Sequence, residues 1–139
     1  MKTTENLLSK LWIFLTVNYI FCDVFSLYHS KFLNDLLVGN VDGIEFTEPF
    51  LLSFAIIMEI PMLMIMLSMI LKNKLNRIIN MIVGVLMIVI QIGSFATGTN
   101  SLHYIFFSSI EIGTLLLILY IAWKWAAQRT FNNNSIEGI

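Results

Sequence analysis

The chain has 139 residues, of which 58% are hydrophobic and 12% are charged, and its mean hydropathy is +0.82. These values lie far outside the range of water-soluble domains and indicate a membrane protein. The net charge of −1 and the lack of a basic cluster exclude a nucleic-acid-binding surface. The length allows about four spans of roughly 20 residues and leaves little for any other domain.

Four apolar segments are predicted to cross the membrane as helices, at residues 11–28, 49–71, 78–96 and 102–123. Trp12 and Tyr28 fall at the two ends of the first span, where amphipathic rings prefer the membrane interface. The fold class is therefore all-α, with a single membrane domain that forms an antiparallel four-helix bundle.

The loop at residues 29–48 is the only sizeable connection, and its apolar residues recur at helical spacing before Gly39. This pattern predicts a short interfacial helix that ends at the glycine. Thr47 supplies a side-chain acceptor for a helix N-cap, and Pro49 fits the first turn of the second span. The start of that span is therefore well defined.

Two further segments lack apolar periodicity. The polar link at residues 97–101 is short, so the third and fourth spans are expected to be antiparallel neighbours. The tail at residues 129–139 contains three successive asparagines and is predicted to be disordered.

The positions of the eight Lys and Arg residues predict the orientation, because short cytoplasmic segments carry an excess of positive charge. Seven of them lie before the first span, between the second and third spans, or after the fourth. Only Lys31 lies in the loop at 29–48, which instead holds Asp35, Asp42, Glu45 and Glu48. Both termini are therefore predicted to be cytoplasmic.

Three acids lie inside the predicted spans: Asp23, Glu59 and Glu111. A charged side chain at the bilayer centre costs about 2.5–3.5 kcal/mol on insertion scales, and intramembrane acids are commonly functional. In the predicted orientation Asp23 lies in the outer part of its span, and Glu59 and Glu111 lie near mid-depth. No Lys or Arg lies within the predicted spans, so we expect shared hydrogen bonds, protonation or a bound cation.

Small and polar residues recur at helical spacing along the first, third and fourth spans, and such stripes face protein rather than lipid. Close helix packing is the favoured explanation for the Ser, Thr and Gly positions, whereas the intramembrane acids favour a functional role. Pro61 is expected to bend the second span beside Glu59. We predict a polar pocket in the outer half of the bundle, with Glu59, Glu111, Asp23, Gln91, Tyr104 and Ser108 as its ligand-binding residues.

The main hypothesis is that Glu59 and Glu111 form a coupled, partly protonated pair that binds a proton, a cation or a small hydrogen-bonding solute. The alternative is an accessory subunit whose polar faces meet a second copy or another membrane protein. An enzyme is the least favoured class, because the Glu-x-x-His pairs of a di-iron bundle are absent. No catalytic residue, metal or cofactor is predicted, and the lipid bilayer is the partner that the composition requires.

Two segments also resemble the signature of a known family: Met58-Glu59-Ile60-Pro61, and Leu102-His103-Tyr104-Ile105-Phe106-Phe107 followed by Ile110-Glu111. They resemble an uncharacterised bacterial family of small four-helix membrane proteins, a domain of unknown function. Leu11-Trp12-Ile13-Phe14, Asp23 and Ala122-Trp123-Lys124-Trp125 also fit, so the resemblance covers nearly the whole chain. It implies a multi-pass protein of the bacterial inner membrane and no particular activity.

The orientation can be tested by labelling single cysteines in a Cys22→Ala background. Cysteine at Asp42 should react with a membrane-impermeant maleimide on intact cells, because the loop at 29–48 is predicted to face outward. Cysteine at Lys74 should react only after the membrane is opened. Labelling of the Lys74 position in intact cells would contradict the predicted orientation.

Overall fold

The computed structural model describes residues 2–97 and 101–136, with the side chains of residues 3–96 and 101–125. The described elements are α1 (Lys2–Leu27), α2 (Ser30–Val38), β1 (Asn40–Val41), β2 (Ile44–Glu45), α3 (Glu48–Ile70), α4 (Asn73–Thr97) and α5 (Leu102–Ile136). Helices α1, α3, α4 and α5 are each long and apolar enough to cross a membrane. The predicted fold of four membrane-spanning helices is therefore confirmed.

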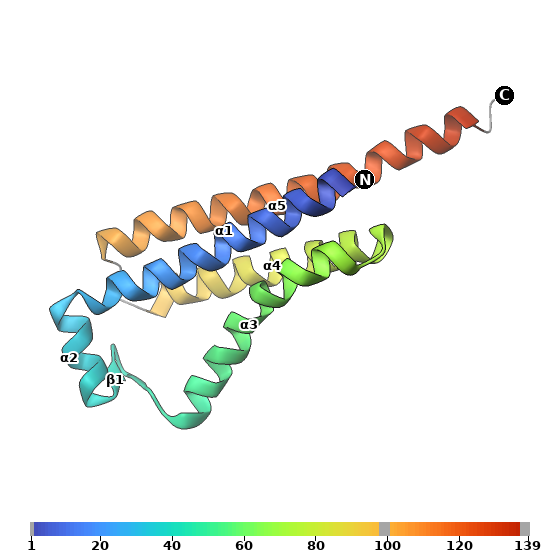
Figure 1. Cartoon of the computed structure of the whole chain (residues 1–139). Helices are drawn as coiled ribbons and strands as arrows, with labels where there is room; N and C mark the ends of the chain where they lie inside the picture. The colour runs from blue at the N-terminus through green and yellow to red at the C-terminus, as the bar shows by residue number, and fades with distance from the viewer. Residues whose placement is uncertain (1, 98–100, 137–139) are drawn as a thin grey trace.

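Successive long helices run in opposite directions, so the two ends of the bundle differ (Figure 1). One end, here called the terminal end, holds the start of α1, the α3–α4 connection and the distal part of α5. The other end, here called the α2 end, carries α2 and the β1–β2 hairpin. Both termini lie at the same end, and the side of the membrane that this end faces remains a prediction.

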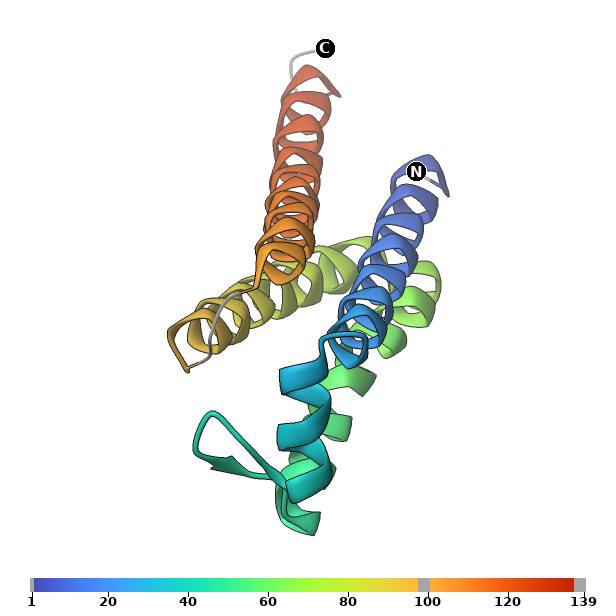
Figure 2. The same ribbon diagram turned by 90° about the vertical axis from the view of Figure 1, so that its left-hand side faces the viewer.

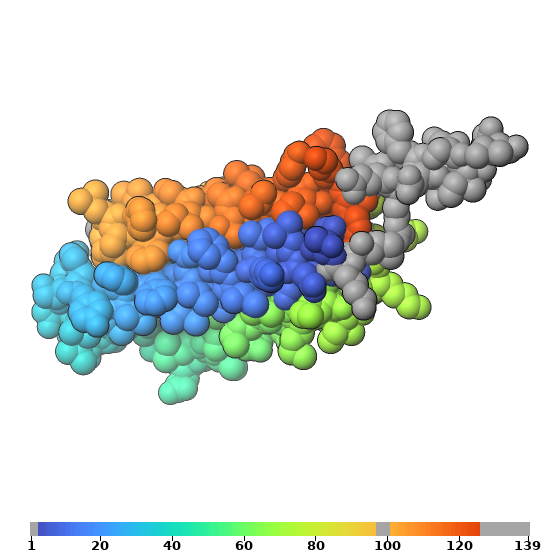
Figure 3. All heavy atoms as spheres, turned by 45° about the horizontal axis from the view of Figure 1, so that its top comes forward, coloured from blue at the N-terminus to red at the C-terminus, as the bar shows by residue number. Residues whose placement is uncertain are grey.

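Helix α1 lies at the centre of the packing, with α3 on one side and α5 on the other, and α4 packs on α5 (Figure 3). The approach of α4 to α5 is close at Gly84, where an added Cβ would lie 2.8 Å from Leu119 Cδ2. The main apolar core joins all four long helices and comprises Leu8, Trp12, Leu15, Tyr19, Met64, Met87, Leu115, Ile118 and Trp125.

Helices α3 and α4 contact each other over a short length only. Helix α3 changes direction along its length, as predicted for a helix with an internal proline, Pro61 (Figure 1). The half of α3 nearer the α2 end therefore leads away from the bundle. At the α2 end the ends of α3 and α4 lie apart, as the view onto that end shows (Figure 2).

Buried amide side chains hold α1, α3 and α4 together towards the terminal end. Asn80 accepts a hydrogen bond from Trp12 Nε1 (2.7 Å), and its own Nδ2 donates to Asn76 Oδ1 (2.7 Å). Asn76 Nδ2 donates to the carbonyl oxygen of Ser68 on α3 (2.6 Å). All four residues are fully buried, so this network replaces water for groups that lipid cannot solvate.

Local signals place the elements of the α2 end. Gly39 ends α2 in the left-handed conformation (φ 79°), and Thr47 Oγ1 accepts from Phe50 N (3.4 Å) as the N-cap of α3. Both features were predicted. The hairpin was not predicted, although Asp42 and Gly43 both have positive φ and form the type of two-residue Asp-Gly turn that joins hairpin strands.

Several predicted boundaries differ from the structure. Helix α1 begins at Lys2, so Trp12 is not at the end of the helix, and its side chain is fully buried in the core between the helices. Helix α5 runs to Ile136, so the predicted disorder does not hold for residues 129–136, where neither Gly nor Pro interrupts the helix. Most of the predicted link at 97–101 and the last three residues lie outside the described residues.

Removal of the hydrogen bond between Trp12 and Asn80 should destabilise the bundle. A double-mutant cycle with Trp12→Phe and Asn80→Leu should give a coupling energy of about 0.5–2 kcal/mol, the range of buried interhelical hydrogen bonds in membranes. Thermal or denaturant unfolding in detergent micelles measures it. Ser109→Ala serves as the control, because Ser109 is exposed and bonds only within its own helix. A coupling energy near zero would contradict this role for Asn80.

Candidate functional site

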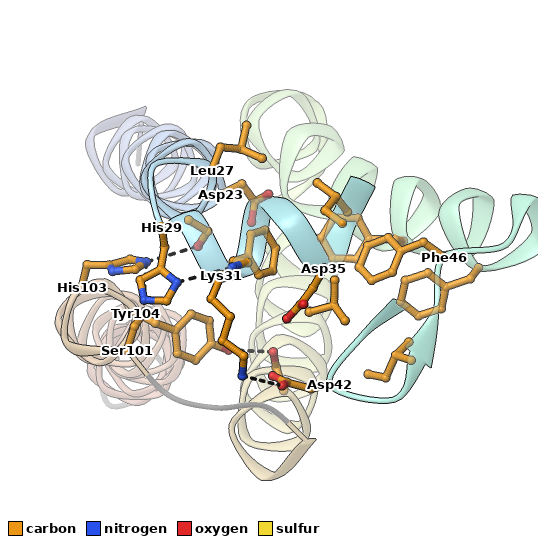
Figure 4. A pocket seen from close by; sticks show the side chains of 18 residues that line it. Asp23, Leu27, His29, Lys31, Asp35, Asp42, Phe46, Ser101, His103 and Tyr104 are labelled. Atoms are coloured by element: carbon orange, nitrogen blue, oxygen red, sulfur yellow. Dashed lines mark hydrogen bonds and ion pairs between the residues drawn. The ribbon is translucent and has the colours of Figure 1, made fainter. Parts of the chain in front are cut away.

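A cavity of about 390 Å³ opens at the α2 end of the bundle (Figure 4). Its walls come from the end of α1, from α2 and the hairpin, from the start of α3, and from the facing ends of α4 and α5. The divergence of α3 from α4 leaves room for it. The cavity exists because α2 and the hairpin cover an end of the bundle that the long helices do not close.

One wall of the cavity is rich in hydrogen-bonding side chains. His103 on α5 lies within hydrogen-bonding distance of Ser101 (3.1 Å) and Ser26 (3.4 Å), and its ring lies 6.4 Å from that of His29. His29 also caps α2, where its Nδ1 accepts from Phe32 N. These groups can each donate or accept a hydrogen bond, so this wall suits a polar solute.

Other residues that line the cavity add charge and aromatic surface. Lys31 Nζ lies 3.7 Å from Asp42 Oδ1, and Asp35 projects into the same space (Figure 4). Because Lys31 already pairs with Asp42, the carboxyls of Asp23 and Asp35 give the cavity an acidic character. The aromatic residues that line it are Phe32, Phe46, Phe50, Phe54 and Tyr104.

A second polar group lies deeper, between α4 and α5. Gln91 Nε2 donates to Ser108 Oγ and to Glu111 Oε2, each at 2.8 Å. All three side chains are buried, and Glu111 is only 1% exposed. The other carboxyl oxygen, Glu111 Oε1, has no hydrogen-bond partner within the described part of the chain.

Asp23 connects the cavity with this buried group. It lines the cavity, and it lies close enough to Glu111 for an electrostatic interaction. Tyr19, one turn before Asp23 on α1, is also buried, and its hydroxyl has no hydrogen-bond partner among the described residues. Asp23, in the cavity wall, and Glu111, in the interior, are therefore near enough for the charge of one to affect the other.

Five of the six predicted site residues fall into two groups. Asp23 and Tyr104 line the cavity, whereas Gln91, Ser108 and Glu111 form the buried hydrogen-bonded group between α4 and α5. Tyr104 also shares a hydrogen bond with Ser94 (2.6 Å). The polar stripes of α4 and α5 thus face each other, as their helical spacing indicated.

The sixth residue, Glu59, does not join them. Helix α3 buries Pro61, Met64 and Ser68, whereas Glu59 lies about half a turn round the helix from these residues and is exposed. It therefore does not share the enclosed surroundings of Glu111. The hypothesis of a coupled Glu59–Glu111 pair within one chain is wrong, because Glu59 is exposed while Glu111 is buried and accepts a hydrogen bond from Gln91.

The family of the chain follows from comparison with known proteins. A family model described as a family of unknown function (DUF6326) matches residues 1–132. The chain belongs to this family. The resemblance read from the sequence, to a family of unknown function that covers nearly the whole chain, is therefore confirmed, and no curated protein or solved structure matches.

Several side chains of this DUF6326 site were not predicted from the sequence. His29, Lys31, Asp35 and Asp42 belong to the loop at 29–48, whose fold the hydropathy pattern does not specify. The Asp-Gly pair of the hairpin turn was the one local signal that pointed to their arrangement. Among the described residues no group of three or more His, Cys, Asp or Glu side chains is arranged to hold a metal ion.

In this DUF6326 protein, Gln91→Leu should lower the unfolding free energy by about 1–3 kcal/mol, because the buried acceptor Glu111 Oε2 and the Ser108 hydroxyl both lose their partner. The double variant Gln91→Leu/Glu111→Leu should recover part of this loss, since it removes both polar partners together. Unfolding followed by circular dichroism in micelles measures both. Equal stability of Gln91→Leu and the unmodified protein would contradict the structural role of Gln91.

Proposed function

We propose that this protein binds a small cationic solute in the cavity at the α2 end. Binding of the cation releases a proton from the carboxyl groups of Asp23 and Glu111. The observation that carries the proposal is the double role of Asp23. Its carboxyl belongs both to the wall of the cavity and to the electrostatic surroundings of the buried Glu111. A ligand at Asp23 therefore acts on a group that solvent does not reach.

The preference for a cation rests on charge and on aromatic surface. Asp23 and Asp35 contribute two carboxyls that no Lys or Arg of the cavity wall pairs with, because Lys31 already lies against Asp42. Phenylalanine and tyrosine rings attract cations through the negative potential of their faces. An organic monocation with an apolar body matches both features better than an anion or a sugar.

Proton exchange follows from simple electrostatics. Glu111 has no cationic neighbour in the described part of the chain, and its free oxygen Oε1 lacks a hydrogen-bond donor. A cation bound against Asp23 would stabilise negative charge on both acids, so that either of them can release its proton. This is the elementary step of proton-linked transport, and a proton-linked sensor uses the same step.

The test is calorimetry with choline and its uncharged isostere dimethylbutanol on protein in lipid nanodiscs. Choline should bind at least about tenfold more tightly, because only choline interacts with the carboxyls. Titrations in buffers of different ionisation enthalpy should show release of up to about one proton per choline. Asp23→Asn and Glu111→Gln should each remove this release.

Asp35→Asn is the matched control, because Asp35 lines the cavity but is not among the electrostatic neighbours of Glu111. It should weaken the binding of choline and leave proton release per bound choline unchanged. Equal affinity for choline and dimethylbutanol would rule out a cation site. Choline binding without proton release in the unmodified protein would rule out the exchange.

A further inference from the structure

Glu59 lies at the middle of a membrane-spanning helix and faces away from its own bundle. Helix α3 extends from Glu48 to Ile70, so Glu59 is eleven residues from either end. Its side chain is exposed, and no described residue forms a hydrogen bond or ion pair with it. A carboxyl at this depth is costly against lipid, so protein or water must cover it.

The residues around Glu59 form a continuous exposed face, here called the α3 seam. They follow one another at intervals of four, three, four, three and four residues, which keeps them on one side of the helix. The apolar members are between 48% and 72% exposed. The α3 seam consists of Leu52, Ile56, Glu59, Leu63, Met66 and Ile70.

Three observations make this face available for a partner helix. The apolar window of α3 is 11% buried, against 39% for that of α1, so much of the surface of α3 does not pack within the bundle. The seam lies opposite the buried residues Pro61, Met64 and Ser68. The intervals of four and three residues are those by which two helices can interlock along one face, and Glu59 gives this face a carboxyl that lipid does not solvate.

We infer that the α3 seam binds the α3 seam of a second copy of this chain. Two copies inserted in the same direction place every seam residue at the depth of its equivalent, so a two-fold axis brings Glu59 next to its counterpart. A protonated carboxyl both donates and accepts, so two such groups pair through two hydrogen bonds and carry no net charge. No separate basic partner is then needed at a depth where this chain has none.

Cross-linking tests the arrangement in the full-length protein in lipid vesicles. Single cysteines at Leu52, Ile56 and Leu63, in a Cys22→Ala background, should form disulfide-linked dimers on mild oxidation. Cysteines at Leu51 and Met69 are the matched controls, because these side chains are also exposed but point about 100° away from the centre of the seam. Disulfides form only when the two Cα atoms approach within about 7 Å, so only the seam positions should react.

Variants of Glu59 test the carboxyl pair. Glu59→Gln should keep the dimer, because paired amides also donate and accept, whereas Glu59→Ala should weaken dimerisation roughly threefold to tenfold. Dimerisation is measured by energy transfer between labelled copies as the lipid-to-protein ratio rises, and Leu51→Ala is the control. Equal cross-linking at Leu51 and Leu52, or a monomer at all dilutions, would overturn the proposal. A monomer would assign Glu59 to a different membrane protein.

Discussion

The hydrogen bond from Trp12 to Asn80 holds the arrangement of the helices at the terminal end. In a membrane the backbone of each helix is already satisfied, so polar side chains and close packing must bring the helices together. The side chain of Asn80 accepts a hydrogen bond from Trp12 on α1 and donates one to Asn76 on α4. Asn76 in turn donates to a backbone carbonyl of α3. Since α3 and α4 touch over a short length only, their ends lie apart at the α2 end.

The open end explains why the polar groups of the chain fall into separate sets. Near Asn80 the buried side chains of α1 and α4 hydrogen-bond to one another and to the backbone of α3. Towards the α2 end the bundle widens, so Gln91 and Glu111 still meet across α4 and α5, whereas Asp23 faces a cavity. The same divergence of helices therefore leaves the Gln91–Glu111 pair buried between α4 and α5 and opens the cavity that Asp23 faces.

The sequence was sufficient for the spans and for the inward faces of α4 and α5, but not for the direction of Glu59. In α4 the small and polar residues share one side, so the packed face is unambiguous. In α3 apolar residues occur on every side, and the polar residues Glu59 and Ser68 lie on opposite faces. The helical period shows that these two side chains point in opposite directions. It does not show which of them is buried; the packing of α3 on α1 buries Ser68.

Helix α3 also links the cavity to the outer surface of the bundle. Phe50 and Phe54 line the cavity from the start of this helix, and Leu52 and Ile56, on the opposite side, belong to the α3 seam. The bend at Pro61 separates the half of α3 nearer the α2 end from the half that packs at Ser68. A second copy bound at the seam would therefore also restrain the cavity wall that Phe50 and Phe54 form from the same half of α3.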